Sequence, residues 1–388
     1  MSSPRFPRRP GHRRRHPQHE KQGPLRRGAG ATALLAYALS FALHPGGASG
    51  QALEPRMPVE RTEIGGRVQL QFNSTTGGGA ASEFLVRRAR IWAATRVNDW
   101  IDGAVQVDVS AGKAAARYAF VRLSLSESTR VSFGQFKRAF DLFELTSSSQ
   151  ILVVERDGGI RGVTDCGGVG RICSYSAFSE SLQFSSVDVG VLVEGTWGGE
   201  SLRYLASFTN GAGGNRREEN DAKSASLRLE WRPAPRLRLG GNLGLHDHPD
   251  TLSGGDAFAS AVALDAEWGD FDSGLHIQAG IMTGENWKAP SPASARVRFL
   301  TWQAIASYRI PRPEGRRIAA VEPVARISWG DPSRSSAGGG DRDGGWLLTP
   351  GFQLHFQGRN KFAANADVWK PASGATEWGV KLQTYLYF

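Results

Sequence analysis

The chain has 388 residues, a formal net charge of +10 and 40% hydrophobic residues, and none of its apolar stretches reaches the roughly 20 residues of a spanning helix. This excludes an α-helical membrane protein. Nine Arg and Lys residues and one acid lie within 1–27, which leaves about +2 for the rest, so the charge does not indicate nucleic-acid binding. Forty-eight Gly and nineteen Phe against three Met favour an all-β chain of short strands and turns.

Residues 1–52 have the pattern of an export signal. A basic segment comes first, an apolar run over 31–43 follows it, and small residues occupy 48–50. This order of charge, apolar run and small residues is typical of a secretory signal peptide. We therefore expect removal of the signal, with residues 53–388 as the mature domain.

Beyond residue 60, apolar and polar residues alternate with a period of two. Val68, Leu70 and Phe72 alternate with polar neighbours, and the same period recurs over 105–110 and 118–125. Such strands have one apolar and one polar face. A soluble sandwich has strands of this kind too, so alternation alone does not decide between a sandwich and a barrel.

The lengths of the connections separate these two architectures. We predict sixteen strands, at 66–74, 84–97, 101–110, 115–125, 129–137, 187–197, 200–208, 226–232, 236–246, 258–268, 271–282, 296–309, 317–329, 346–357, 361–370 and 376–388. The links after even-numbered strands are tight, and most links after odd-numbered strands are long. Because a strand edge in lipid would leave backbone groups unpaired, this plan predicts a closed antiparallel transmembrane β-barrel of about sixteen strands, with long extracellular loops and short periplasmic turns.

Aromatic residues at the strand ends support the barrel. With both termini periplasmic, the apolar phase of the strands places tryptophans at two rims: Trp197, Trp231 and Trp268 at the inner rim, and Trp329, Trp346 and Trp378 at the outer rim. Amphipathic rings prefer the headgroup level of a membrane. The final residue, Phe388, shares its phase with Leu386 and Leu382, which resembles the terminal strand of outer-membrane barrels.

Residues 63–370 resemble the phosphate-selective porin family of Gram-negative outer membranes, most clearly at 87–90, 134–137, 188–191 and 209–211. The resemblance implies a sixteen-stranded barrel, often trimeric, whose third loop folds inward. It also implies a cell outer-membrane location, contact with membrane lipid and lipopolysaccharide, and passage of small hydrophilic solutes or anions. No nucleic acid is expected as a partner.

The longest link, 138–186, is the third loop and the expected constriction. Its candidate basic residues, with the end of the preceding strand, are Lys137, Arg138, Arg156 and Arg161. We expect the loop arginines near the pore axis. Cys166 and Cys173 lie in the same loop of an exported chain, so we predict that a disulfide joins them and stiffens the loop.

The phase of the strands predicts which charges face the lumen. Thirteen basic and eleven acidic residues do so, and the pore-lining candidates are Arg88, Arg90, Arg122, Arg228, Arg238, Arg326, Asp108 and Glu230. Rings of Arg or Lys attract anions, whereas acidic rings attract cations. The alternative for each arginine is a structural pair with a lumen carboxylate. Arg87 shares the phase of Leu85 and Ala89, so we expect it on the outside at the rim.

Motifs of enzymes and metal sites are weak in this chain. His246, Asp247 and His248 have the H-x-H spacing of binuclear metallohydrolases without the fold that such a site needs. The acidic segment 341–344 lacks the spacing of acidic ligands that an EF-hand loop has. We therefore expect no cofactor, no metal and no enzyme activity, and we predict a passive porin with a possible anion or phosphate preference. The alternatives are a barrel that does not conduct, with a structural or adhesive role, and an outer-membrane enzyme.

Overall fold

The computed structural model describes residues 59–76, 82–110, 112–156, 174–218, 220–249, 256–289, 296–314, 316–334 and 344–388. The predicted signal peptide at 1–52 lies outside these residues, as do 341–343 of the acidic segment. No helix within the described ranges is long and apolar enough to cross a membrane.

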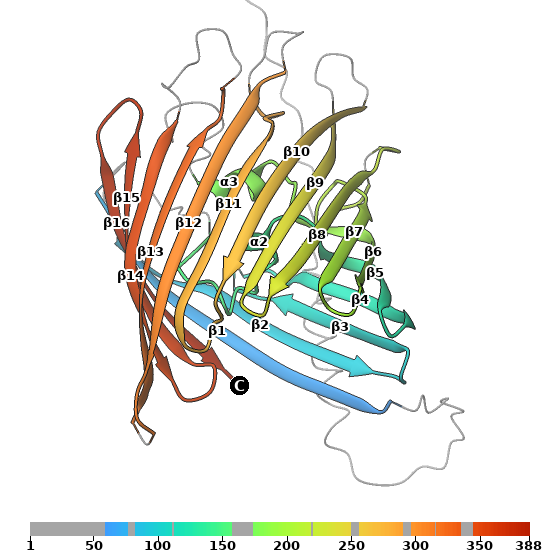
Figure 1. Ribbon diagram of the computed structural model, residues 1–388, viewed down its shortest axis with the longest axis horizontal. Helices are drawn as coiled ribbons and strands as arrows, with labels where there is room; N and C mark the ends of the chain where they lie inside the picture. The colour runs from blue at the N-terminus through green and yellow to red at the C-terminus, as the bar shows by residue number, and fades with distance from the viewer. Residues whose placement is uncertain are drawn as a thin grey trace, which may run out of the picture. The chain divides into compact units, whose positions relative to one another are not determined.

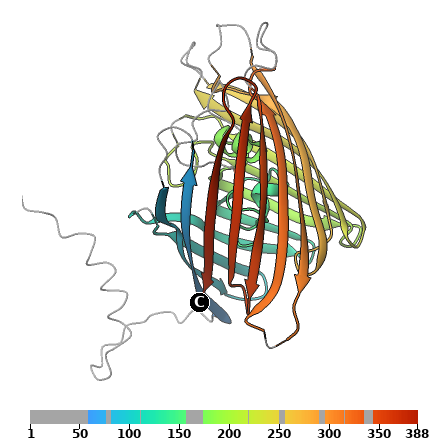
Figure 2. The ribbon, with the colours of Figure 1, turned by 90° about the vertical axis from the view of Figure 1, so that its left-hand side faces the viewer.

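Sixteen antiparallel strands form a closed ring in which each strand pairs with its neighbours in sequence. They are β1 (Arg61–Thr75), β2 (Ser82–Arg96), β3 (Ile101–Asp108), β4 (Ala115–Ser126), β5 (Thr129–Lys137), β6 (Val187–Trp197), β7 (Leu202–Thr209), β8 (Ser224–Ala234), β9 (Leu237–Pro249), β10 (Asp256–Trp268), β11 (Gly274–Glu285), β12 (Arg298–Pro311), β13 (Ile318–Asp331), β14 (Gly345–Phe356), β15 (Lys361–Pro371) and β16 (Glu377–Tyr387). The ring closes where β1 pairs with β16, with Arg67 opposite Tyr387 and Thr75 opposite Gly379. The predicted closed barrel is confirmed (Figures 1 and 2).

The two ends of the barrel differ in their connections. The links that follow even-numbered strands have two to six residues, whereas the link after β5 spans 138–186 and the link after β7 spans 210–223. In the turn between β6 and β7, Gly198 and Gly199 have φ of 64° and 74°. Glycine adopts this left-handed backbone without steric cost, so the turn can be tight. The predicted sorting of long loops and short turns to opposite ends is therefore correct.

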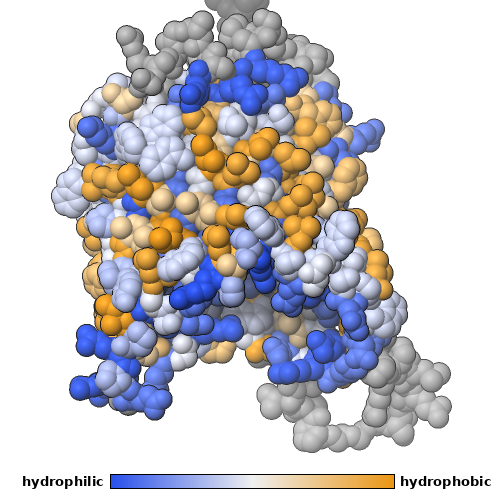
Figure 3. All heavy atoms as spheres, in the orientation of Figure 1, coloured by the Kyte–Doolittle hydropathy of each residue, from blue (hydrophilic) through white to orange (hydrophobic). Residues whose placement is uncertain are grey.

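The outer face of the barrel is apolar. Along β10, Val262 and Leu264 are exposed, while their neighbours Ala261 and Ala263 are buried inside. Large hydrophobic side chains gather at mid-height on the visible face, between hydrophilic ends (Figure 3). Five of the six predicted belt tryptophans are exposed near strand ends, namely Trp197, Trp231, Trp268, Trp346 and Trp378, whereas Trp329 near the end of β13 is half-buried.

The link after β5 folds into the barrel over its described parts, 138–156 and 174–186, where the helices α2 (Leu142–Leu145) and α3 (Tyr175–Ser181) lie inside the ring of strands (Figures 1 and 2). We call it the constriction loop. Asp141 caps α2, since its Oδ1 accepts a hydrogen bond from the Phe143 N–H, and Ser174 caps α3 through the Ala177 N–H. Side-chain oxygens at these positions satisfy backbone donors that the first turn of a helix leaves unpaired.

The loop packs on one side of the lumen, against strands that carry small inward-facing residues. We call Ala259, Ala261, Ala263, Gly280 and Gly330, on β10, β11 and β13, the small-residue wall. Loop aromatics fill the space that these residues leave. The resulting hydrophobic core includes the loop residues Phe140, Phe143, Leu152, Val153, Tyr175, Phe178, Leu182 and Phe184 and the strand residues Met282, Phe299, Ile305 and Val324. This side of the lumen is therefore packed like the interior of a soluble protein.

Candidate functional site: a basic cavity beside the constriction loop

The opposite side of the lumen stays open. Lumen-facing residues of β3 and β4, such as Gln106 and Tyr118, are half-exposed, whereas those of β8 and β10 are buried beneath the loop. A cavity of about 440 Å³ lies in this region between the loop and the strands. Its walls are formed by β1, β2, β3, β4 and β16 on one side and by 144–149, Glu155 and Arg156 of the loop on the other.

The cavity has an excess of positive charge. The eight basic residues that line it are Arg67, Arg87, Arg88, Arg90, Arg117, Lys137, Arg156 and Arg359, and the four acidic ones are Asp108, Glu144, Glu155 and Glu180. This is a stronger bias than the thirteen to eleven of the whole predicted lumen. A narrow zone lined in this way attracts anions. Four of these residues, Arg117, Lys137, Glu144 and Glu180, also line a second cavity of about 270 Å³ next to the loop after β7.

Arg87 faces the lumen, so the prediction that it lies on the outside is wrong. The pairing of β1 with β2 shifts by one residue at this point, since Gln69 lies opposite Arg88 while Leu70 lies opposite Val86. Arg87 is the extra residue of a β-bulge, and a bulge re-aims side chains by interrupting the alternation. Two consecutive arginines therefore project inward.

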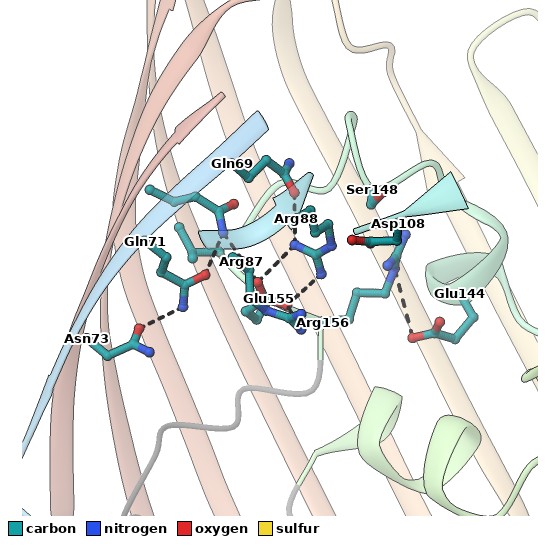
Figure 4. A network of polar contacts seen from close by, with 12 residues as sticks. Gln69, Gln71, Asn73, Arg87, Arg88, Asp108, Glu144, Ser148, Glu155 and Arg156 are labelled. Carbon is teal, nitrogen blue, oxygen red and sulfur yellow. Dashed lines mark hydrogen bonds and ion pairs between the residues drawn. The ribbon is translucent and has the colours of Figure 1, made fainter. Parts of the chain in front are cut away.

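Both arginines bind the carboxylate of Glu155 in the constriction loop (Figure 4). An Arg87 Nη2–H group donates to Glu155 Oε2 at 2.9 Å, and Arg88 donates from both Nη atoms, at 3.0 Å to Oε1 and 2.8 Å to Oε2. Gln383 on β16 donates to Oε1 at 3.3 Å. Burial alone would raise the pKa of Glu155, but the charges of Arg88 and Arg87 lower it well below its ordinary value. The carboxylate is therefore ionised.

A second ion-pair cluster fixes the start of the loop. Lys137 at the end of β5 donates to Glu144 Oε2 at 2.7 Å, and Arg156 Nε lies 3.9 Å from Glu144 Oε1. Although burial of Glu144 would raise its pKa, the charges of Lys137 and Arg156 lower it. The two predicted basic residues of the loop region therefore line the cavity while they hold an acid of α2.

Arg90 and Arg67 complete the basic wall. Arg90 Nε donates to Asp108 Oδ2 across β2 and β3 at 2.7 Å, and its Nη1 donates to Ser148 in the loop at 3.1 Å. Arg67 donates to the hydroxyls of Ser148, at 2.8 Å, and Tyr387, at 3.4 Å. Within the described ranges, Arg67, Arg117 and Arg359 form no ion pair with a carboxylate.

Other predicted pore residues lie on the lumen face but under the constriction loop. Arg228 is 2% exposed and donates to Asp265 at 2.6 Å and 2.8 Å, and Arg326 is 2% exposed and donates to Asp367 at 3.0 Å. Arg326 also donates to the carbonyl oxygens of Glu155 and Arg156. These two arginines hold the wall and the loop, which is the structural alternative that the sequence left open.

The remaining predicted strand residues lie in smaller networks away from the cavity. Arg122 pairs with Asp102 at 2.8 Å. Arg238 pairs with Glu267, and Glu230 lies 3.6 Å from Arg228 and 3.3 Å from Arg232. None of these residues lines the basic cavity.

Arg138 was expected near the pore axis, but the structure places it elsewhere. Its side chain is 1% exposed at the base of the loop, where Nε donates to the Thr209 hydroxyl at 3.1 Å and lies 3.8 Å from Asp188. Its Nη1 also donates to the Gln183 carbonyl and lies 3.3 Å from His246. The side chain therefore contacts β6 and β7 and connects the two ends of the constriction loop through the Gln183 carbonyl.

Several predictions for the loop fall outside the described residues: those for Arg161 and for the disulfide between Cys166 and Cys173. His246, from the H-x-H motif, is 2% exposed and lies near Arg138 and the Ser224 hydroxyl. Among the residues that the structure describes, no group of three or more His, Cys, Asp or Glu side chains could hold a metal ion.

Sequence reasoning did not select Arg87, Arg117 and Gln383 as site residues. Gln383 shares the lumen phase of Lys381 and could have been found from it. Arg117 shares the apolar phase of Ala119, and it is the extra residue of a second register shift, since Gln106 lies opposite Tyr118 while Val107 lies opposite Ala116. The inward position of Arg87 depends on the β-bulge. The sequence of β2 contains no Gly or other evident signal that predicts a bulge.

A closed barrel with an apolar outer face, an inward-folded loop and a charged cavity beside that loop defines a porin of the bacterial outer membrane. Residues 62–267, more than half of the chain, match the family model of phosphate-selective porins O and P. The chain belongs to this family, whose members are channels rather than enzymes. The predicted family, outer-membrane location and porin function are therefore confirmed.

Solved structures of outer-membrane proteins share the fold. The anion-selective porin from Comamonas acidovorans has 10% identity and a TM-score of 0.59, covering 84% of this chain and 99% of that one. The outer-membrane channel DcaP of Acinetobacter baumannii has 12% identity and a TM-score of 0.57, covering 84% and 97%. The trimer form of OmpT from Vibrio cholerae has 12% identity and a TM-score of 0.54, covering 84% and 99%. No curated protein sequence matches the chain.

Proposed function

We propose that this porin conducts small anions along the open side of its lumen, through the basic cavity. The observation that carries the proposal is the ratio of eight basic to four acidic residues around that cavity. Arg67 and Arg117 stand out because the described residues give neither of them a carboxylate partner. A permeating anion would supply the missing counter-charge.

The position of the cavity fits a route through the barrel. At one end it shares four residues with the cavity beside the loop that follows β7. At the other end it reaches Arg359, in the short turn between β14 and β15. The residues that line the two cavities therefore extend from the long-loop end of the barrel to its short-turn end. The similarity to a porin described as anion-selective agrees with this route.

The test is the reversal potential of the purified porin in a planar lipid bilayer under a KCl gradient. An anion-selective pore gives a potential near the Nernst potential of chloride. A reversal potential of the opposite sign would refute the anion preference, but it would still show that the protein conducts ions. A correctly inserted barrel without any conductance would favour the non-conducting alternative.

We further propose that the mature porin begins after residue 52, that it contacts membrane lipid and lipopolysaccharide through its aromatic rims, and that it associates as a trimer. The trimer form described for OmpT, an outer membrane protein of Vibrio cholerae, supports the last point. N-terminal sequencing of the exported protein and analytical ultracentrifugation in detergent test the cleavage site and the association.

A further inference from the structure

Arg117 is turned into the lumen by a β-bulge in β4. It is the extra residue at the register shift between Gln106 and Val107 of β3. Regular alternation would place it on the same face as Val121, which is exposed on the outside of the barrel. The bulge interrupts the alternation and re-aims the side chain. Arg117 therefore lines both the basic cavity and the second cavity beside the loop after β7.

The bulge lies at an open edge of the sheet. The pairing of β4 with β5 ends at Ala119 and Gln135, although β4 continues to Ala115. Beyond Lys137, where β5 ends, the chain enters the constriction loop. A backbone donor or acceptor without a partner is costly away from water. The start of β4 thus needs partners from outside the strand ladder.

Two side-chain amides supply these partners, one from the loop after β7 and one from β5. Asn215 Oδ1 accepts from the Ala116 N–H at 3.1 Å, and Asn215 Nδ2 donates to the Ala116 carbonyl at 2.9 Å. Gln135 Nε2 donates to the same carbonyl, and its Oε1 accepts from the Asn215 N–H at 2.8 Å. We call Asn215 and Gln135 the amide clip. It holds residue 116 as a neighbouring strand would, directly before Arg117.

The backbone at both members of the amide clip is unusual. Asn215 has φ of 62°, in the left-handed region that Asn adopts more readily than most residues. Gly134, which precedes Gln135, has φ of 131°. Gln135 is buried, although Phe133, two residues earlier in the same strand, is exposed on the outer face. Such backbone outliers persist where the surrounding contacts impose them.

We propose that Asn215 and Gln135 are positioning residues for anion conduction: by fixing the bulge, the amide clip holds the Arg117 guanidinium at the junction of the two cavities. The inference rests on the proposed anion conduction and adds to it a control point on the loop after β7. Within the described ranges no carboxylate pairs with Arg117. The direction of its side chain therefore depends on the backbone that carries it.

The test uses neutral variants, so that the net charge of the porin stays constant. Asn215→Gly removes one amide at a φ that glycine adopts without strain, and Gln135→Leu removes the other. The matched control is Asn220→Ala in the same loop. The Asn220 side chain donates to Asp247 at 3.2 Å and to Asp256 at 2.9 Å, so this change loosens the loop at a different anchor.

The first readout is the reversal potential in a planar bilayer under a KCl gradient. Both clip variants should lower the ratio of chloride to potassium permeability by about twofold, whereas Asn220→Ala leaves it unchanged. Adding Asn215→Gly to Arg117→Gln should have no further effect, because the charge that the clip positions is already absent. An equal effect of Asn215→Gly with and without Arg117 would indicate a general loosening of the loop and overturn the inference.

The second readout does not depend on ion preference. Arg117→Cys is labelled in detergent with an anionic methanethiosulfonate reagent, and the rate is followed by mass spectrometry, with the unmodified porin as the blank. A thiol reacts as its thiolate, which water favours and apolar surroundings disfavour. If loss of the clip turns residue 117 toward the detergent, adding Asn215→Gly should slow the labelling by about tenfold. An unchanged rate would overturn the inference.

The two readouts separate this inference from the proposed function. A cation-selective unmodified porin in which Asn215→Gly slows the labelling would refute anion conduction and keep the role of the amide clip in directing residue 117. An anion-selective porin in which neither readout responds to the clip variants would keep anion conduction and refute the positioning role.

Discussion

The ring of Phe178 on α3 stacks on the ring of Phe299 on β12, with centroids 5.0 Å apart and an interplanar angle of 19°. Both rings are fully buried. This contact joins the constriction loop to the packed side of the lumen, and the open side exists because the loop stays there. The position of the loop therefore determines the width of the proposed path.

We expect Phe178→Ala to loosen the constriction loop. Removing a buried aromatic ring costs about 3–5 kcal/mol where the surroundings do not collapse into the space. The loop should become accessible to protease, and the single-channel current should become larger and noisier. The control is Phe352→Ala, which removes an exposed ring on the outer face. Unchanged proteolysis and current in Phe178→Ala would show that the stack does not hold the loop.

The small-residue wall gives a second prediction. A Cβ at Gly280 would lie 2.9 Å from the Phe143 ring, so Gly280→Ala should displace α2 and destabilise the folded barrel by about 1–3 kcal/mol. Gly241→Ala is the matched control, because the nearest atom to its Cβ, on Leu264, lies 3.9 Å away. Thermal unfolding in detergent, followed by circular dichroism, measures both variants. Equal unfolding temperatures for the two variants would show that the constriction loop does not pack tightly against the small-residue wall.

Neutralising cavity arginines that lack an acidic partner in the described structure should reduce anion preference. Arg67→Gln and Arg117→Gln remove charge from the cavity without leaving a carboxylate unpaired there. We expect each to shift the reversal potential toward zero, and the double variant to shift it further. Arg236→Gln is the control, since Arg236 is half-exposed and pairs with Asp270 at the rim. A shift as large in the control would indicate a long-range effect of net charge.

Asp141 makes the seating of the loop depend on pH. Burial, together with the nearby charges of Glu144 and Asp265, raises the pKa of Asp141 to about 8, so its carboxyl is protonated in the folded chain at neutral pH. The folded state then binds more protons than the unfolded state between about pH 4 and pH 8, and stability falls as pH rises through that range. The loss is at most about 1.4 kcal/mol per pH unit.

Asp141→Asn should remove this slope, because an amide does not titrate and its oxygen can still accept from the Phe143 N–H. The thermal midpoint of the unmodified barrel should fall between pH 5 and pH 8 more steeply than that of the variant. Parallel slopes would show that Asp141 titrates in its ordinary range.

The strands and the outer face could be predicted from the sequence because lipid and water impose a period of two on each strand. The Ala259, Ala261 and Ala263 series also lies in the lumen phase, and small residues there are a sign that something packs against them. The inward fold of the constriction loop was expected, but the side of the lumen on which it packs could not be predicted, since that depends on the fit of Phe143 and Phe178 against Gly280 and Gly330. For the same reason Arg228 and Arg326 were expected at the pore and lie beneath the loop.

The basic cavity also could not be predicted from the total charge of the lumen, which is nearly balanced. Arginines of the packed side cancel against Asp265, Glu267 and Asp367, and only the geometry shows that the basic excess lies on the open side. The inward turn of Arg87 results from one inserted residue in β2. A prediction based on strict alternation of faces assigns a bulge residue to the wrong face. Only the pairing of the strands shows where the bulge lies.

The two residues at 155–156 touch strands from both ends of the chain. Their carbonyl oxygens are held by Arg326 on β13, while the Glu155 carboxylate is held by Arg88 on β2 and Gln383 on β16. A nascent cylinder whose final strand has not yet docked lacks part of this clasp. Because Gln383 of the last strand contributes one of these contacts, we expect closure of the barrel between β16 and β1 to stabilise the seated position of the constriction loop.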